Sequence, residues 1–436
     1  MRLSPLRTVV TSFNPKKTST PSSLPSSSTY DGYYEEGDWV LCVAANEEQR
    51  SVACALSNGE IQLYDQSTMH LLNTYQRDNL VTDMTFETFQ TNVLAATSND
   101  GSLTLYDIRQ SPTSNPVLQL KNMLRPEEEA LSLSIGFGGN IAAVGSSKGK
   151  IHFFDVREKR GILGSYTQAH TDEVTRVRFQ TISTCGGSSP TTRNTSPILV
   201  SGSEDGLACV FDTSQPTEES ALTNILAVQS PIREVGFFGP NYEAIYCLTG
   251  SESLLLYHKD DAVCRKDFGP QFRDHLSRQL QQQQQQQGIV GNPPMSATTI
   301  SPMEYLVDCH WDHSRQELSL LAGSARGDAG FFQVGEHGTT PLHYLHGGHR
   351  GVIRAWHANR LNNSSSFTVG EDARLCEWSR SSLCPAIMQA NGASSSSVPA
   401  PQVIMPSRKR PGAPMVGSVG GGKLRRPRSR LTSSPY

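Results

Sequence analysis

Short runs in which apolar and polar residues alternate recur along most of the chain. Seven of these runs have the two-residue period of a half-buried strand, and they span 39–45, 81–86, 131–137, 174–179, 232–238, 305–311 and 352–357. A second apolar run follows six of them, at 52–57, 93–98, 141–146, 198–203, 244–250 and 318–324. A helix would instead place apolar residues three and four positions apart. The pattern therefore predicts an all-β fold.

A third run closes each unit and ends in an aromatic residue. The seven aromatics are Tyr64, Tyr106, Phe154, Phe211, Tyr257, Phe332 and Trp378. Successive aromatics are 42, 48, 57, 46, 75 and 46 residues apart, and a four-stranded propeller blade takes about 40–45 residues. The two long intervals contain a Ser/Thr/Gly/Pro segment at 184–197 and a segment at 260–301 that includes a glutamine tract. Such compositions predict disordered, low-complexity insertions, with the glutamines as a solvated spacer.

Charge is unevenly distributed along the 436 residues. The chain has 38 Lys and Arg and 41 Asp and Glu, yet residues 1–30 and 381–436 contain basic residues and no acidic ones. An acidic body is a poor general nucleic-acid binder, except through its basic ends. There is no apolar run of about 18 residues, so no membrane span is expected. Nine cysteines stand singly without C-x-x-C, which favours a reducing compartment.

Seven such units resemble the seven-bladed WD-repeat β-propeller. In that family a His, a Ser or Thr, an Asp and a Trp form a buried hydrogen-bond network within a blade. The resemblance assigns a full set in the last unit, at His349, Thr368, Asp372 and Trp378. The fourth unit supplies His170, Ser201 and Asp205, with Phe211 in the place of Trp. A structural role follows for these residues rather than a catalytic one.

The similarity extends to the WD repeat-containing protein 89 family. The stretches that carry it are AHTDEVTRVRF (169–179), LVSGSEDGLACVFD (199–212), AIYCLT (244–249), YLVDCH (305–310) and GGHRGVIRAWH followed by GEDARLCEW (347–378). Their order and spacing agree over roughly residues 39–380. The resemblance implies a propeller and carries over no enzyme activity.

The last unit lacks a clear fourth strand. Residues 7–13 read RTVVTSF, a β-branched alternating run that we expect to complete this unit and close the ring. Residues 385–389, PAIMQ, are the alternative. The predicted organisation is an amino-terminal segment at 1–37 with a flexible loop at 14–37, a propeller at 38–380, and a disordered basic tail at 381–436. If residues 7–13 close the ring, a cleaved mitochondrial leader is disfavoured.

Two motifs with catalytic or metal-binding associations have plainer interpretations. Residues 145–149, GSSKG, fit the G-x-S-x-G nucleophile motif, but they connect two predicted strands instead of a strand and a helix. His343, His346 and His349, and His310 with His313, lack the cysteine or carboxylate spacing of zinc sites. We predict no cofactor, no metal and no small-molecule substrate.

The basic tail contains two separated clusters of positive charge. These are Arg408, Lys409 and Arg410, and then Lys423, Arg425 and Arg426. Two such clusters on a Gly/Pro-rich spacer fit the two acidic pockets of an import receptor, which predicts a nuclear import signal. An arm that binds RNA or DNA phosphates and a merely solvated tail are the alternatives. The expected location is the nucleus, the cytoplasm or both.

These patterns together predict a non-enzymatic scaffold that binds other proteins on a preformed surface. Contacts are expected on the face that carries the loops before the first strands, with candidate residues Asp38, Asn79, Glu129, Asp172, Arg233, Glu304 and Arg350. A nucleic-acid-associated factor of ribosome biogenesis or chromatin, tethered by the tail, is the alternative. A propeller-based ester hydrolase is a third reading, but no nucleophile with an adjacent base is evident.

Overall fold

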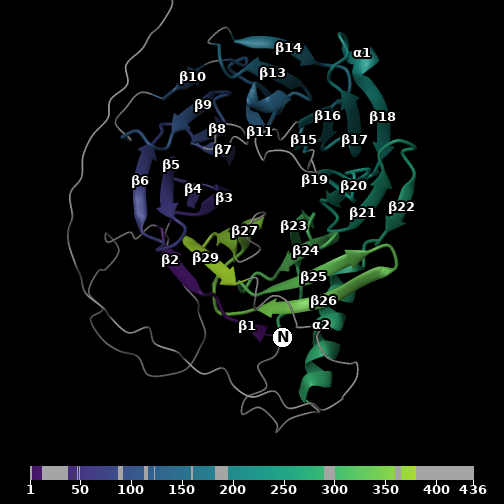
Figure 1. Ribbon diagram of the computed structural model, residues 1–436. Coiled ribbons are helices and arrows are strands. Elements are labelled where there is room, and N and C mark those ends of the chain that lie inside the picture. Colours follow the sequence, from purple (N-terminus) through teal and green to yellow (C-terminus); the bar gives the residue numbers. More distant parts are fainter. Residues whose placement is uncertain are drawn as a thin grey trace, which may run out of the picture. The chain divides into compact units, whose positions relative to one another are not determined.

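The alternating runs form seven antiparallel sheets that follow one another around a ring (Figure 1). The computed structural model describes residues 2–11, 38–46, 48, 50–86, 92–111, 116–121, 123–158, 161–181, 195–288, 300–358 and 365–379. The predicted all-β propeller is confirmed. Residues 380–436, which include the basic tail, lie outside the described residues.

Each sheet is one blade, and its first strand lies nearest the ring axis (Figure 1). Blade 1 contains β3 (Val40–Asn46), β4 (Ser51–Leu56), β5 (Glu60–Asp65) and β6 (Leu71–Gln76). Blade 2 contains β7 (Val81–Phe86), β8 (Val93–Ser98), β9 (Leu103–Asp107) and β10 (Leu118–Leu120). Blade 3 contains β11 (Ala130–Gly136), β12 (Ile141–Ser146), β13 (Ile151–Asp155) and β14 (Ile162–Tyr166), with the short 3-10 helix η2 (Phe137–Gly139) after β11.

The second half of the ring repeats this order. Blade 4 contains β15 (Arg176–Thr181), β16 (Thr195–Gly202), β17 (Leu207–Asp212) and β18 (Leu222–Ala227), with helix α1 (Glu218–Ala221) before β18. Blade 5 contains β19 (Ile232–Phe238), β20 (Ala244–Thr249), β21 (Leu254–His258) and β22 (Cys264–Asp267). Blade 6 contains β23 (Tyr305–Asp312), β24 (Glu317–Gly323), β25 (Ala329–Gly335) and β26 (Gly338–Leu345). Blade 7 contains β27 (Ile353–Ala358), β28 (Ser365–Gly370) and β29 (Arg374–Ser379).

Apolar side chains are buried between neighbouring blades, because each sheet packs one face against the next sheet. Seven buried clusters lie in the described part of the chain, one at each junction between blades. At the junction of blades 7 and 1, Val40 and Leu56 pack with Phe367 and Val369. The apolar core is therefore continuous around the ring.

The amino-terminal segment completes blade 7 and extends blade 6. Strand β2 (Arg7–Val10) runs antiparallel to β29, with Arg7 opposite Glu377. Strand β1 (Arg2–Leu3) runs parallel to the outer edge of β26 (Figure 1). The segment also reaches blade 1, since Gln62 Nε2 donates to the Thr11 carbonyl at 3.0 Å. The fourth strand of blade 7 thus comes from the start of the chain, while the alternative segment at 385–389 lies outside the described residues.

The glutamine tract departs from the sequence prediction. Residues 272–288 form helix α2 (Phe272–Gly288), which packs against blade 6 (Figure 1). Phe272, Leu276 and Leu280 recur every four residues, and their side chains are buried. In the tract that follows, Gln283 Nε2 donates to the Pro341 carbonyl at 2.8 Å. The apolar stripe orders a segment whose average composition predicts disorder. Within the described residues, no helix has the length and apolar character needed to cross a bilayer.

Candidate functional site

The two predicted blade networks are assembled in the structure. In blade 7, His349 Nδ1 lies 3.0 Å from Asp372 Oδ1, and its Nε2 lies 2.8 Å from Thr368 Oγ1. Trp378 Nε1 donates to the same hydroxyl at 2.8 Å. In blade 4, His170 Nδ1 lies 3.1 Å from Asp205 Oδ2. These contacts satisfy buried polar atoms and connect each loop to its own sheet.

Phe211 cannot donate a hydrogen bond, so blade 4 completes its network differently from blade 7. His170 Nε2 lies 2.7 Å from Ser201 Oγ, while the Phe211 ring stacks on Tyr166 with centroids 4.8 Å apart. Burial lowers the pKa of His170, although Asp205 opposes the shift. The imidazole is therefore neutral at pH 7 and has a structural role.

Blades 3 and 6 contain networks that the sequence reasoning missed. In blade 3, Ser146 Oγ donates to Glu128 Oε1 at 2.7 Å, and His152 Nε2 lies 2.8 Å from the same oxygen. In blade 6, Asp328 binds Ser301, Tyr344 and His346. In blade 3 the histidine lies in β13, and in blade 6 it directly follows β26. In blades 4 and 7 the histidine instead precedes the first strand of its own blade. All four blade networks pair an acidic residue with a histidine, and a search of the sequence for such pairs could have found the two that were missed.

The two serines of the GSSKG motif make hydrogen bonds within blade 3. Ser147 lies in the turn between β12 and β13, and its Oγ accepts from the Glu129 amide at 2.9 Å. Two strands flank the motif, so it lacks the strand-to-helix geometry of a nucleophile elbow. Ser146 and Ser147 therefore stabilise a hairpin.

All seven residues predicted for the interaction face are connected to the turn between the second and third strands of their own blade. The pairs are Asp38–Asn58, Asn79–Asp100, Glu129–Ser147, Asp172–Ser203, Arg233–Glu252, Glu304–Ala325 and Arg350–Asp372. Four of the seven are exposed, namely Glu129, Asp172, Glu304 and Arg350, and the other three are half-buried. Because each loop is held to a turn on the same face of its blade, we call this surface the braced face.

Trp39 is the large aromatic of the braced face. It directly precedes β3, and 45% of its surface is exposed. The guanidinium carbon of Arg354 lies 5.4 Å from the centre of its ring. Arg354 also donates to Glu371 Oε1 and lines the cavity at the ring axis. Arg354 therefore connects Trp39 to the wall of the central cavity.

The central cavity has a volume of about 380 Å³ and is lined by the innermost strand of every blade. Six of these strands have an irregularity in their pairing with the second strand, near the start of the strand. The residues at which regular pairing resumes are Cys42, Asp83, Ser132, Glu234, Asp308 and Ala355. In blade 4, Arg176 opens β15. These positions bring acidic and basic side chains from four blades to the axis.

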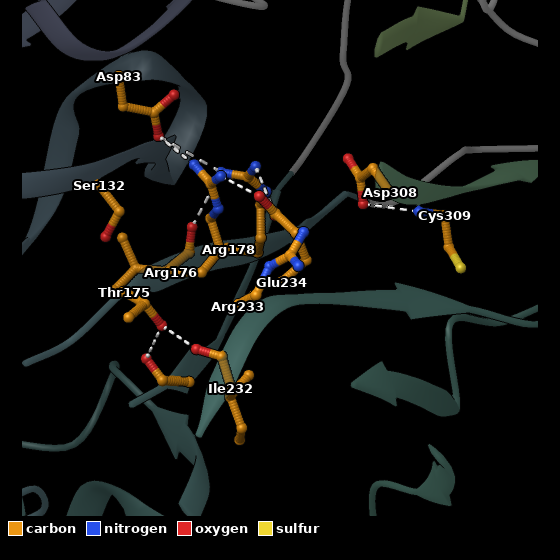
Figure 2. Close-up of polar contacts among 12 residues, drawn as sticks. Asp83, Ser132, Thr175, Arg176, Arg178, Ile232, Arg233, Glu234, Asp308 and Cys309 are labelled. Carbon is orange, nitrogen blue, oxygen red and sulfur yellow. Dashed lines mark hydrogen bonds and ion pairs between the residues drawn. The ribbon is translucent and has the colours of Figure 1, made fainter. Parts of the chain in front are cut away.

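Arg176 connects three blades through the axis (Figure 2). Its Nη1 donates to Asp83 Oδ2 at 3.0 Å, and its Nη2 donates to Glu234 Oε1. Arg178 lies further out, with its Nη atoms 3.7 Å from Asp83 Oδ2 and 3.8 Å from Glu234 Oε2. Burial opposes the charge on Arg176, but Glu234 and Asp83 outweigh it and raise the pKa above its usual range. Arg176 therefore keeps its positive charge.

Asp308 stands apart from the arginine network, and Figure 2 shows its contact with Cys309. Its Oδ1 accepts from the Cys309 amide at 2.7 Å and from the Tyr246 hydroxyl at 3.1 Å. Tyr246 reaches the axis because Gly236 leaves room, since a Cβ there would lie 2.6 Å from the hydroxyl. Burial and the charge of Glu234 raise the pKa of Asp308 to about 7, although Arg178 and Arg176 oppose the shift.

The sequence reasoning missed this axial cluster. Asp83, Arg176 and Arg178 alternate with apolar residues in the runs at 81–86 and 174–179, as solvated residues of a half-buried strand also do. Aligning the units by their turns places Asp83, Arg176 and Glu234 at equivalent positions. That alignment was the available signal, because equivalent positions of innermost strands meet at the axis of a ring.

The remaining predicted sites divide into two groups. His346 binds Asp328 and His349 binds Asp372, so the loop histidines belong to separate blade networks. Within the described residues, no group of three His, Cys, Asp or Glu side chains is arranged to hold a metal. The proposed import residues, Arg408, Lys409, Arg410, Lys423, Arg425 and Arg426, lie outside the described residues.

Comparisons with known proteins agree with this architecture. No family model matches the chain. WD repeat-containing protein 89 homolog of Dictyostelium discoideum is 25% identical over 345 residues, which cover 79% of this chain and 84% of that protein. WD repeat-containing protein GTS1 of Arabidopsis thaliana is 24% identical over 356 residues, covering 78% and 81%.

A solved structure shares the fold at low sequence identity. A chain in the crystal structure of a mitotic checkpoint complex matches with a TM-score of 0.59 and 13% identity, covering 86% of this chain and 94% of that chain. That likeness concerns the fold alone. With its seven blades and its His–Ser/Thr–Asp networks, the chain is a seven-bladed β-propeller that is similar to WD repeat-containing proteins over most of its length.

Proposed function

We propose that this protein is a non-enzymatic scaffold that binds partner proteins on the braced face, as a subunit or adaptor of a nuclear or cytoplasmic complex. WD-repeat propellers generally serve as protein-interaction scaffolds. The observation that carries the proposal here is the half-exposed Trp39 on a face whose loops are already held in place. Tryptophan is enriched among the residues that dominate binding energy, and a preformed surface spares the entropy of ordering.

The test is affinity purification with mass spectrometry on matched variants of the full chain. Trp39→Ala removes the exposed aromatic of the braced face, and Leu163→Ala removes a side chain of similar exposure, 54%, on the outer strand β14. A third version ends at Arg380 and lacks the basic tail. We expect Trp39→Ala to lose a stoichiometric partner set that the other two versions retain. Thermal unfolding of each variant serves as the folding control.

Two results would contradict the proposal. Retention of all partners by Trp39→Ala would exclude the braced face around this residue. Loss of partners only in the version that ends at Arg380, together with their release by nuclease, would favour a basic arm on nucleic acid. Nuclear targeting is tested separately, by imaging the full chain and a variant with Arg408, Lys409 and Arg410 changed to Ala, which we expect to be excluded from the nucleus.

A further inference from the structure

Asp308 is an acidic side chain of the central cavity that has no basic partner among the described residues. Four acidic residues line the cavity, namely Glu48, Asp83, Glu234 and Asp308, together with Arg176, Arg178 and Arg354. Arg354 donates to Glu371. Arg176 and Arg178 bind Asp83 and Glu234, whereas Asp308 makes no ion pair within the described part of the chain. In addition, Glu234 Oε2 is buried and has no hydrogen-bond partner. Asp308 lies on the blade 6 side of the cavity.

Small side chains form part of the cavity wall beyond Asp308, alongside Arg354, Trp356 and His357. Blade 7 contributes Ala355 to it, and blade 1 contributes Cys42 and Ala44. Burial raises the pKa of the Cys42 thiol, so this side chain is neutral. Short side chains leave space on this side, whereas Arg176 and Glu234 fill the opposite side. The cavity volume, about 380 Å³, is within the roughly 300–1,000 Å³ of ligand pockets.

The charges determine which kind of group this space would stabilise. A half-buried carboxylate without a cation is costly, and an opposite charge relieves that cost. An anion would find all three guanidinium groups already paired with carboxylates. A cation on an aliphatic stem would place its charge on Asp308 Oδ2 and its methylene groups along Ala355 and Cys42.

We infer that the central cavity receives the cationic end of one lysine or arginine side chain from a partner protein, with Asp308 as its acceptor. The inference rests on the proposed scaffold function and adds the chemistry of the segment that is bound. Trp39, Arg354 and Glu371 lie where that segment would enter, because Arg354 both lines the cavity and contacts Trp39 and Glu371.

The test starts from a displayed library of random 12-residue peptides selected on the full chain. Asp308→Asn removes the charge and keeps an oxygen for the Cys309 amide and the Tyr246 hydroxyl. Asp155→Asn is the matched control, because Asp155 pairs with the exposed Arg157 in blade 3, away from the cavity. We expect the wild type and Asp155→Asn to enrich peptides with one fixed lysine or arginine, and Asp308→Asn to lose that enrichment.

The best peptide is then made with citrulline in place of arginine, or norleucine in place of lysine. Calorimetry should show at least tenfold weaker binding to the wild type for the neutral peptide, and no difference between the two peptides on Asp308→Asn. If Asp308→Asn does not fold, Ala355→Leu narrows the cavity without changing its charge and should weaken binding by a similar factor.

Three outcomes would overturn the inference. Enriched peptides without a shared cation, or equal affinity for the wild type and Asp308→Asn, would remove Asp308 as the acceptor. Agmatine that binds as tightly as the peptide would make the cavity a small-amine site instead. If Trp39→Ala loses the cellular partners while Asp308→Asn keeps them, the scaffold function stands and the cationic insertion fails.

Discussion

Blades 2, 4 and 5 face the ring axis with Asp83, Arg176 and Glu234, whereas blades 6 and 7 face it with Asp308 and Ala355. In the first group the charges bind one another across the cavity and hold blades together. In the second group the strands present an unpaired carboxylate and a small side chain. Equivalent positions of the innermost strands can therefore either link blades through ion pairs or leave room for a ligand, depending on the charges of the neighbouring residues.

The two groups also differ in how their blades are built. Blades 2 to 5 are each made from one continuous stretch of chain, while blades 6 and 7 each add a strand from residues 2–10. Glu377, which is 3% exposed, depends on Arg7 from that distant segment for its charge partner. The side of the ring with the open cavity wall is thus also the side where the two ends of the propeller meet.

The largest expected effect comes from deleting residues 2–11. The deletion exposes the edge of β29 and leaves the buried Glu377 without a cation, which should lower the free energy of unfolding by about 4 kcal/mol. Denaturant unfolding followed by intrinsic fluorescence measures the loss. If the deletion lowers the free energy of unfolding by less than Arg176→Met does, closure of blade 7 contributes less to stability than the arginine network does.

Arg176→Met tests the arginine network at the ring axis. The substitution leaves Asp83 and Glu234 facing each other with only the more distant Arg178, and we expect a loss of roughly 3 kcal/mol. Arg157→Met is the control, since Arg157 pairs with Asp155 on the exposed surface, where an ion pair contributes little to stability. Equal losses for the two variants would mean that the arginine network does not hold the blades together.

Asp308→Asn tests the blade 6 side of the cavity through the dependence of stability on pH. Its carboxyl has a pKa of about 7 in the folded protein and about 3.9 in the unfolded chain. The folded state therefore holds the proton more tightly, so the stability that Asp308 contributes is present below pH 4 and is lost as the pH rises to 7. The groups that face it are Glu234, Arg176, Arg178, Tyr246 and Cys309, and His310 lines the same cavity.

Replacing Asp308 with Asn removes this titration. Relative to the wild type, the variant should gain about 1–2 kcal/mol of stability between pH 5 and pH 7.5, less than the full conversion of the shift because Asp308 is partly exposed. Unfolding curves at the two pH values give the difference. A difference that does not change with pH would place the carboxylate in a solvated or paired environment.

The smallest effects compare the turns of blades 4 and 7. Gly206 in blade 4 has φ of 80°, and Ala373 occupies the equivalent position in blade 7 with φ of 55°. We expect Gly206→Ala to cost about 1 kcal/mol and Ala373→Gly to gain about 0.5 kcal/mol, because side chains strain this conformation. Thermal unfolding at matched pH measures both. If both variants changed stability in the same direction, backbone strain at this turn position would not be the cause.

The networks of blades 4 and 7 were predictable from the sequence because each lies within one repeat, whereas the charged residues that meet at the ring axis were not. His349, Thr368 and Trp378 lie within 30 residues of one another, and a single unit shows their pattern. Asp83 and Glu234 lie 151 residues apart and meet only after the ring has closed. Helix α2 was missed for a different reason, since its three apolar residues are outweighed by glutamines in any average of composition.

The pairing of Arg7 with Glu377 has a consequence for synthesis. At about 5–20 residues per second, a ribosome needs roughly 20–75 s to add the 370 residues that separate these partners. During that interval β2 lacks the strand with which it pairs, because blade 7 does not yet exist. The ring must therefore remain open throughout its own translation, and its last seam can form only when almost all of the propeller has left the ribosome.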